Sequence, residues 1–283
     1  MPELAEVEFY RRQWDPGLQQ GILSVQMGRA GRVFRGSDRK ALLTGLVGAV
    51  LASSTRHGKQ MLFRTDRGGW LGIHLGMTGE LRVVSPGFKP GRHDHLVFVQ
   101  RQRVLVFTDP RQFGRIRFHP DASPPEWWSN LAVEPHWPAF TRTLMAAFLA
   151  RHARAPLKAV LLSQEGFPGV GNWMADEILW RARLYPALPA GQLNLKGLGA
   201  LYRAVRFVCA GALRIVAKDH SDPPPAWLFQ HRWEPGGSCP RDRAPLRRAT
   251  IGGRTTVWCP RCQGPGANVK RHGMSRPPHR RDQ

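Results

Sequence analysis

The sequence is short of acidic residues. It holds 20 Asp and Glu against 42 Lys and Arg, which gives a formal net charge of +22 at pH 7. A surface of this charge needs an anionic partner, and nucleic acid is the usual one. A bias toward GC-rich codons accounts for the excess of Arg over Lys, but it does not account for the shortage of acids.

Long apolar runs and cysteines are also scarce. No apolar run reaches the ~18–20 residues of a membrane helix, and the N-terminus lacks the basic and apolar segments of a signal peptide. Four cysteines in 283 residues are too few for a disulfide scaffold. We therefore expect a cytoplasmic protein without a membrane partner, which in a bacterium would meet the nucleoid there.

Two kinds of pattern divide the chain. Residues 3–13 carry apolar residues at helical spacing, and short apolar or alternating runs then recur between clusters of Gly, Pro, Asp and Arg. Such runs are typical of an antiparallel sandwich or barrel. The stretch DASPPEWWSN at 121–130 ends this part, and helical patterns follow it. The expected strands lie at 22–27, 49–55, 60–65, 70–75, 79–84, 95–100, 103–108 and 115–120, and the expected helices at 140–152, 155–165, 173–184 and 198–219.

These patterns predict an α+β protein in four parts. We expect an N-terminal antiparallel β-sandwich with a leading helix at 1–125, a helical domain at 126–225, and a small cysteine-containing hairpin unit at 226–263. Residues 264–283 hold few large apolar side chains and many Arg, Pro and His, which predicts a disordered basic tail.

The opening residues, MPELAEVEFYRR, allow two interpretations of Pro2. A proline can start a helix, because its φ is already near the helical value and its missing N–H has no partner in the first turn. If Met1 is removed, Pro2 is instead the N-terminus. Its ring nitrogen is then a free secondary amine, a potential nucleophile with the Glu3 carboxyl beside it.

The stretch CPRDRAPLRRATIGGRTTVWCPRC predicts a metal site with one unusual ligand. The spacing Cys239-x2-Asp242-x16-Cys259-x2-Cys262 is that of a tetrahedral zinc site in which Asp replaces the second Cys. Such a Cys3Asp site is chemically allowed. It should bind zinc more weakly and lose it more easily at low pH, because carboxylate is the harder ligand. The alternative is a hairpin that needs no metal.

Two glycine-containing turns carry polar side chains of interest. The glycines at 252–253 fit the tip of the predicted hairpin, and Arg254 after them either projects into a groove or is solvated. FPGVGNWMADEILW at 167–180 is a turn that leads into a helix. Its unpaired N–H groups could hold a phosphate with help from the Asn172 amide; the alternative is an ordinary helix corner with Asn172 as N-cap.

Four further side chains lie next to predicted strands. Lys59 precedes a strand, where a lysine is usually a solvated charge. Met77 lies in a glycine-flanked turn, which is a poor place to bury a methionine. Arg111 and Phe113 follow the strand VLVFT. Phe113 either fills the core or is exposed on a basic loop, where it could wedge between bases.

The motifs together resemble those of a known family. The stretches are, in order, PELAEVE, HGKQMLF, HLGMTGEL, DPRQFG, GVGNWMADEILW and GGRTTVWCPRCQ. They resemble signatures of the bacterial formamidopyrimidine-DNA glycosylase / endonuclease VIII family of DNA repair enzymes, and most closely the first type. The resemblance implies a β-sandwich that faces a helix–two-turn–helix domain ending in a zinc finger. A monomer would bind double-stranded DNA with damaged bases or abasic sites in the cleft between them.

The resemblance also implies a mechanism of base excision followed by strand cleavage. The damaged nucleotide leaves the base stack, and the Pro2 amine attacks C1′ of the deoxyribose to form a Schiff base. Glu3 shuttles protons, and Lys59 assists catalysis. Arg254 serves the later step of the β,δ-elimination that cuts the strand. The expected activity is thus that of a DNA glycosylase and AP lyase which removes oxidised bases.

DNA contacts carry over in the same way. Phosphates around the everted nucleotide would be held by Asn172, Arg254 and Lys59. The residues that match further backbone contacts are His93, Arg111 and Arg154. Met77, Arg111 and Phe113 look like the trio that fills the hole left by the damaged base, which offsets an unstacking cost of a few kcal/mol.

The chain departs from the family pattern at three places. Ala5 replaces a usual proline, Asp242 replaces a zinc cysteine, and residues 217–233 lack the Gly/Lys-rich loop of oxidised-purine enzymes. Three alternatives therefore stay open. They are an endonuclease VIII-like enzyme acting on oxidised pyrimidines, a non-catalytic DNA-binding protein on the same fold, and a zinc-ribbon factor that binds RNA or acts in transcription.

Overall fold

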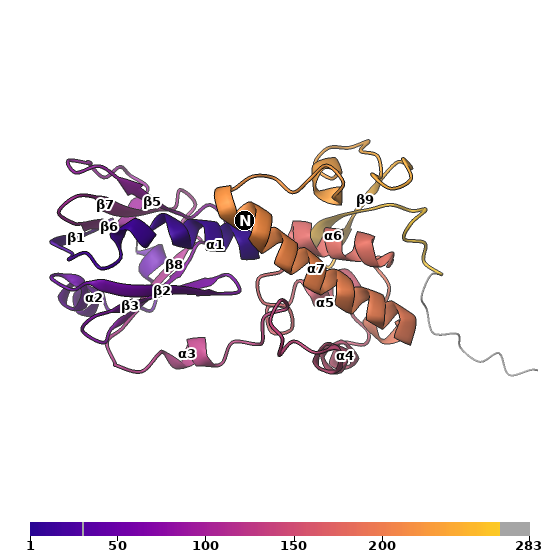
Figure 1. The fold of residues 1–283 in the computed structure, drawn as a ribbon, viewed down its shortest axis with the longest axis horizontal. Coiled ribbons are helices and arrows are strands. Elements are labelled where there is room, and N and C mark those ends of the chain that lie inside the picture. Colours follow the sequence, from indigo (N-terminus) through magenta and orange to yellow (C-terminus); the bar gives the residue numbers. More distant parts are fainter. Residues whose placement is uncertain (30, 267–283) are drawn as a thin grey trace, which may run out of the picture.

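The computed structural model describes residues 1–29 and 31–266. Strands occupy one end of the molecule and helices the other, and the helices α1 and α7 meet between them (Figure 1). The predicted α+β class is confirmed. The predicted basic tail at 264–283 lies almost entirely outside the described residues.

The strand-rich end consists of antiparallel sheets. Within the described residues, β1, β6, β7 and β5 form one four-stranded sheet in that order, and β2, β3, β4 and β8 form another. Every strand expected at this end is present, because each alternates or buries apolar residues between turn residues. The bounds are Ser24–Met27 for β1, Leu51–His57 for β2, Gln60–Thr65 for β3, Trp70–His74 for β4, Glu80–Val84 for β5, Asp94–Val99 for β6, Val104–Thr108 for β7 and Arg115–His119 for β8.

The leading helix α1, Leu4–Gln13, joins the two halves of the molecule. Its Leu4 and Ala5 pack in the core of the helical half, whereas Val7 packs in the core of the sandwich. Ala5 is fully buried, so this position takes a small side chain. Glu3 is the N-cap of the helix. Pro2 therefore precedes the cap and is not the first helical residue, so the interpretation of Pro2 as a simple helix start is wrong.

The four helices expected in the helical half are confirmed. They are α4 (Arg142–Arg151), α5 (Leu157–Leu161), α6 (Asn172–Ala182) and α7 (Leu195–Asp219). The helices α2 (Arg39–Leu46) and α3 (Glu126–Ser129) were not expected from the sequence. Short 3-10 turns lie at Asp15–Gly17 (η1), Arg32–Phe34 (η2), Ala190–Gln192 (η3) and Leu228–His231 (η4). Among the described residues, no helix combines the length and apolar character needed to cross a bilayer.

The C-terminal hairpin pairs β9 (Arg247–Ile251) with β10 (Arg254–Trp258). Its tip is formed by Gly252 and Gly253, whose φ angles are 62° and 73°. Two successive positive φ angles belong to the type I′ turn that suits a two-residue hairpin loop. The expected tip is confirmed, and Arg254 directly follows it.

Candidate active site and nucleic-acid interface

The Glu3 carboxylate caps the helix α6 from the other end of the chain. It accepts hydrogen bonds from the backbone N–H groups of Gly171 (3.0 Å), Trp173 (2.9 Å) and Met174 (3.1 Å). A Cβ at Gly171 would lie 2.2 Å from Cδ of Glu3, so only glycine fits there. The N-cap is Gly171 and not Asn172. The expectation that these N–H groups are free for a phosphate is wrong, because Glu3 already pairs with them.

The environment of Glu3 makes it a proton carrier near neutral pH. Burial raises the pKa of Glu3 to about 7, and the Glu6 carboxylate adds to this rise. Lys59 and the hydrogen bonds from Trp173 and Met174 oppose it. A carboxyl group with a pKa near the working pH can both donate and accept a proton.

Lys59 is a buried lysine, with 9% of its surface exposed. Its interpretation as a solvated charge is therefore wrong. Burial lowers the pKa of Lys59, Arg254 lowers it further, and Glu3 and Glu6 oppose this. These three partners place Lys59 in one electrostatic cluster with the N-terminal segment and the hairpin tip. A lowered pKa leaves more of the amine neutral, as a base or nucleophile requires.

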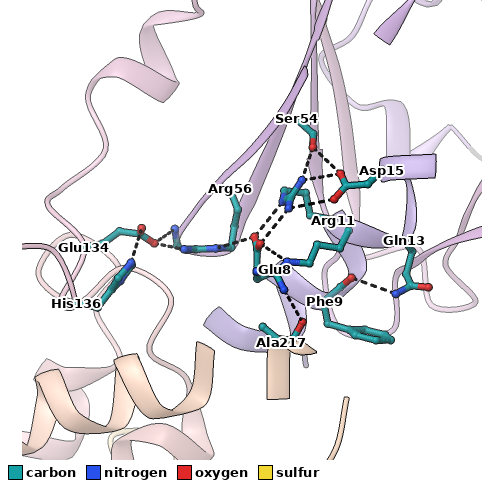
Figure 2. Close-up of polar contacts among 12 residues, drawn as sticks. Glu8, Phe9, Arg11, Gln13, Asp15, Ser54, Arg56, Glu134, His136 and Ala217 are labelled. Carbon is teal, nitrogen blue, oxygen red and sulfur yellow. Dashed lines mark hydrogen bonds and ion pairs between the residues drawn. The ribbon is translucent and has the colours of Figure 1, made fainter. Parts of the chain in front are cut away.

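The turn that carries Lys59 is fixed by a buried acid from the interdomain segment. The Gly58 N–H donates to Oε1 of Glu134 over 2.7 Å, and the Arg56 guanidinium forms an ion pair with the same oxygen. Arg56 also contacts Glu8 of α1 at 3.5 Å. Figure 2 shows this chain of contacts from α1 through β2 to Glu134. Lys59 is thus held between the two halves of the molecule.

The hairpin is docked on α6 by polar contacts at its inner strand. The Asn172 amide nitrogen donates to the Thr255 carbonyl over 2.9 Å. Asp176 accepts from the Val257 N–H over 3.1 Å and forms an ion pair with Arg232 at 2.7 Å. Asn172 and the neighbourhood of Arg254 are therefore brought together, as the resemblance implies.

The structure brings the predicted wedge residues together on two neighbouring loops. Thr78 donates to Oδ1 of Asp109 over 2.7 Å, and the Arg111 N–H donates to Oγ1 of Thr78 over 3.3 Å. The Arg111 guanidinium lies over the Phe113 ring at 5.0 Å. Met77 is 39% exposed and Phe113 is 43% exposed. The interpretation of Phe113 as a core residue is wrong, and the exposed trio has the form of a wedge.

Two predicted phosphate contacts lie away from these clusters in the sequence. His93 is half-buried before β6, and its carbonyl accepts from the Asp109 N–H over 3.0 Å. Arg154 is exposed between α4 and α5. Their contacts with DNA stay a prediction.

The predicted metal ligands converge. One ligand atom from each of Cys239, Asp242, Cys259 and Cys262 lies within 4.8 Å of the others. The Sγ atoms of Cys239 and Cys262 are 3.9 Å apart, close to the edge of about 3.8 Å expected for a tetrahedron with Zn–S bonds of about 2.3 Å. The Trp180 indole N–H points at the Cys239 sulfur over 3.3 Å, as an outer-shell donor would. The donor set and its spacing fit a tetrahedral metal ion.

A cavity of ≈ 330 Å³ opens beside the N-terminus. Its lining includes Pro2 and Met77 and the aromatic residues Tyr10, Trp173 and Trp233. The cavity therefore joins the candidate nucleophile to a wedge residue in one space. An unmodified DNA base is smaller than this volume.

Sequence reasoning missed the acids that hold the site together. Glu6, Glu134 and Asp176 were not singled out, although they contact Trp173, Gly58 and Val257. The available signal was the small number of acids in a basic chain, because each acid that is present is then a candidate for a structural or chemical role.

Family models match both halves of the chain. The model described as the N-terminal domain of formamidopyrimidine-DNA glycosylase matches residues 1–116, and the model of its H2TH domain matches residues 131–222. The chain belongs to the formamidopyrimidine-DNA glycosylase family. It is accordingly an enzyme of the DNA glycosylase class.

Similar proteins cover nearly the whole chain. A formamidopyrimidine-DNA glycosylase of Xanthomonas campestris pv. campestris is 37% identical over 273 residues, covering 93% of this chain and all of the relative. One from Thermomicrobium roseum is 36% identical and covers 93% of this chain and 99% of the relative.

Solved structures of this family share the fold. A Lactococcus lactis formamidopyrimidine-DNA glycosylase bound to DNA with an AP site has a TM-score of 0.82 at 26% identity, covering 93% of this chain and 99% of that chain. MutM in complex with DNA that contains a carbocyclic 8-oxo-G has a TM-score of 0.83 at 26% identity, covering 93% of this chain and all of that chain.

Proposed function

We propose that this glycosylase removes oxidised purines from double-stranded DNA and cuts the strand as an AP lyase, with Pro2 as nucleophile. The position of Pro2 carries the proposal. It lies outside α1, lines a cavity large enough for a base, and precedes a buried acid with a pKa of about 7. The DNA in the titles of the structural neighbours and the net charge of +22 support the choice of partner. A bacterial chromosome is then its place of action.

The chemistry starts when Met1 is removed and the Pro2 amine becomes free. Its typical pKa of about 8 leaves a fraction unprotonated at neutral pH. The nitrogen bonds to C1′ as the bond from C1′ to the base breaks, and the base leaves with the electron pair and takes up the proton that the Pro2 nitrogen loses. The Glu3 carboxyl gives its proton to the ring oxygen, so that the sugar opens and an iminium forms.

Strand cleavage follows from the iminium. It acidifies the hydrogens on C2′, so loss of one of them expels the 3′ phosphate, and a second elimination expels the 5′ phosphate. Lys59, whose pKa burial lowers, moves protons in these steps. Arg254 at the hairpin tip serves the later elimination.

DNA binding uses residues from both halves. Met77, Arg111 and Phe113 fill the space in the duplex that the everted nucleotide leaves. Asn172 and Arg254 hold the phosphates beside it, and the further backbone contacts come from His93 and Arg154.

The metal site takes one Zn²⁺ per chain, held by Cys239, Asp242, Cys259 and Cys262. Bound zinc would cross-link the segments that precede and follow the hairpin, and it would take part in no step of the reaction. Its effect is to keep Thr255 and Val257 against α6.

Borohydride reduction on a duplex with an abasic site tests the mechanism. Protein with a processed N-terminus should form a covalent adduct, because reduction fixes the Schiff base. Protein that retains Met1 or an upstream tag should form at least about 100-fold less, since its Pro2 nitrogen is an amide. An equal yield from both forms would refute Pro2 as nucleophile.

The alternatives make different predictions in the same assays. A processed protein that binds the duplex and forms no adduct would be the non-catalytic DNA-binding protein. A panel of single-lesion duplexes separates an oxidised-purine enzyme from an endonuclease VIII-like enzyme acting on oxidised pyrimidines. Preference for undamaged RNA would support the zinc-ribbon factor.

A further inference from the structure

An aromatic wall lines the cavity beside Pro2. The Trp173 and Phe229 rings lie 5.1 Å apart at 84°, and the Phe229 and Trp233 rings lie 5.1 Å apart at 80°. Trp173 and Phe229 are nearly buried, but Trp233 is 53% exposed. An indole exposed to this degree at the rim of a cavity is typical of a surface that a ligand covers.

Two arginines hold the segment that carries Trp233, one at its ring and one at its backbone carbonyl. The Arg232 guanidinium lies over the Trp233 ring at 4.7 Å and is itself held by the buried Asp176 at 2.7 Å. The Arg248 guanidinium donates to the Trp233 carbonyl over 2.7 Å. A side chain placed in this way presents a fixed flat surface, so little conformational entropy is lost when a ligand stacks on it.

The chain before this segment is short and stiff. Three consecutive prolines, at 223–225, follow α7, and the Trp227 N–H donates to the Pro224 carbonyl over 2.8 Å. His231 contacts the Pro225 carbonyl over 2.9 Å. Trp173, Phe229 and Trp233 already line the cavity, so no long mobile loop is needed to complete it.

Part of the cavity lining is polar. The Glu6 carboxylate lines it and already accepts from the Trp173 indole N–H over 2.9 Å. Its other oxygen accepts from the Glu3 N–H over 3.1 Å, and a carboxylate still has free lone pairs after two such bonds. The cavity therefore offers a flat apolar wall and an acceptor, which fits a planar ring system that carries N–H donors.

We propose that Trp233 is a specificity-determining residue that stacks on the everted base and favours planar oxidised purines over saturated pyrimidines. This inference rests on the proposed function, because Pro2 can attack C1′ only when the attached base lies in the adjoining cavity. A purine offers the larger π surface for stacking. A pyrimidine whose 5,6 bond is saturated is puckered and cannot lie flat on the indole.

The test compares two reactions of the same protein. Single-turnover rates are measured on duplexes with 8-oxoguanine, with 5,6-dihydrouracil and with an abasic site, for the wild type, Trp233→Ala and Trp233→Phe. The readout is the rate of base excision divided by the rate of abasic-site cleavage. Abasic-site cleavage serves as the reference because an abasic site has no base to stack. Phe207→Ala is the matched control, because Phe207 is an aromatic residue of α7 that is 50% exposed and does not line this cavity.

For Trp233→Ala we expect the 8-oxoguanine ratio to fall about 5- to 100-fold, the range that loss of base–aromatic stacking gives. The dihydrouracil ratio should change less than about 2-fold, and Trp233→Phe should restore most of the loss. Equal loss on all three duplexes, or no loss on 8-oxoguanine, would overturn the role of Trp233. A wild type that cleaves none of the duplexes would instead refute the proposed function.

Discussion

At the scale of single residues, the scarce acids of this basic chain organise its backbone. Each buried acid of the described residues accepts at least one backbone N–H: Glu3, Asp94, Asp109, Glu134, Asp176 and Glu177. Removing such an acid leaves buried donors unpaired, which costs about 1–3 kcal/mol for each group. The acids therefore hold the turns, and some of them also pair with buried bases such as Arg56 and Arg232.

Glu3 combines this structural role with a chemical one. Glu3→Gln keeps an acceptor oxygen but cannot transfer a proton, so base excision should fall about 10²- to 10⁴-fold. In the wild type the carboxyl is protonated below its pKa of about 7. The Pro2 amine needs the opposite change, because it is mostly protonated below its typical pKa of about 8. The excision rate should therefore pass through a maximum between about pH 7 and 8 and fall on the alkaline side as Glu3 loses its proton. Single-turnover rates across this range measure the effects of the substitution and of pH.

Glu165→Gln provides the control, because Glu165 is an exposed acid in the turn between α5 and α6. It should keep the wild-type rate and pH profile. A Glu3→Gln protein with an unchanged rate would show that the proton comes from another group.

At the scale of elements, the turn between β2 and β3 depends on a partner from the segment that joins the two halves. Glu134→Gln removes the charge that pairs with Arg56, whose side chain is 8% exposed. The buried guanidinium then keeps only its longer contact with Glu8, so we expect a loss of stability of up to about 3–5 kcal/mol. Lys59 moves with this turn, and abasic-site cleavage should slow.

Thermal unfolding and single-turnover cleavage measure the two effects of Glu134→Gln. The matched variant is Glu126→Gln in α3, where the acid is exposed and both values should stay at the wild-type level. If Glu134→Gln lowered the melting temperature but left cleavage unchanged, Glu134 would have no part in placing Lys59.

These contacts also show where sequence reasoning reaches its limit. The strands at 60–65 and 70–75 and the helix at 173–184 were predictable, because local periodicity and flanking turn residues determine them. The burial of Lys59 was not, since its partners Glu3 and Arg254 are remote in the sequence. The helix α3 is four residues long, too short for a periodic signal.

The proposed zinc site beside the hairpin includes Asp242. Asp242→Cys supplies a fourth thiolate, the softer ligand that zinc prefers. We expect zinc to be retained at least about 10-fold longer against a chelator, with the largest difference at low pH, where a carboxylate is protonated first. Elemental analysis and a chelator-competition time course measure this.

Asp121→Cys is the control, because it adds a thiol at an exposed position away from the cluster. It should leave the retention time unchanged. A wild-type protein without zinc and with an intact hairpin would favour the metal-free alternative.

At the scale of the whole molecule, α1 couples the two halves that must close on one DNA. Leu4 lies in the helical core and Val7 in the sandwich core, so the helix that begins beside Pro2 is fixed from both sides. The turn with Lys59 belongs to the sandwich half and the hairpin tip with Arg254 to the other half, and both contribute charge beside Glu3. The site is therefore assembled only when the halves are docked, and a separate half would lack it.

The net charge gives the last prediction, the salt dependence of DNA binding. Each neutralised phosphate releases counterions and adds about 0.9 to the slope of log K against log salt concentration. Arg254→Ala and Arg154→Ala should therefore each lower this slope by about 0.9. Arg101→Ala, in the exposed turn between β6 and β7, should leave it unchanged. Fluorescence anisotropy over a salt series, with a duplex that carries an uncleavable abasic analogue, measures the slopes. An Arg254→Ala slope equal to that of Arg101→Ala would place the hairpin tip away from the phosphates, and the elimination role of Arg254 would then need another explanation.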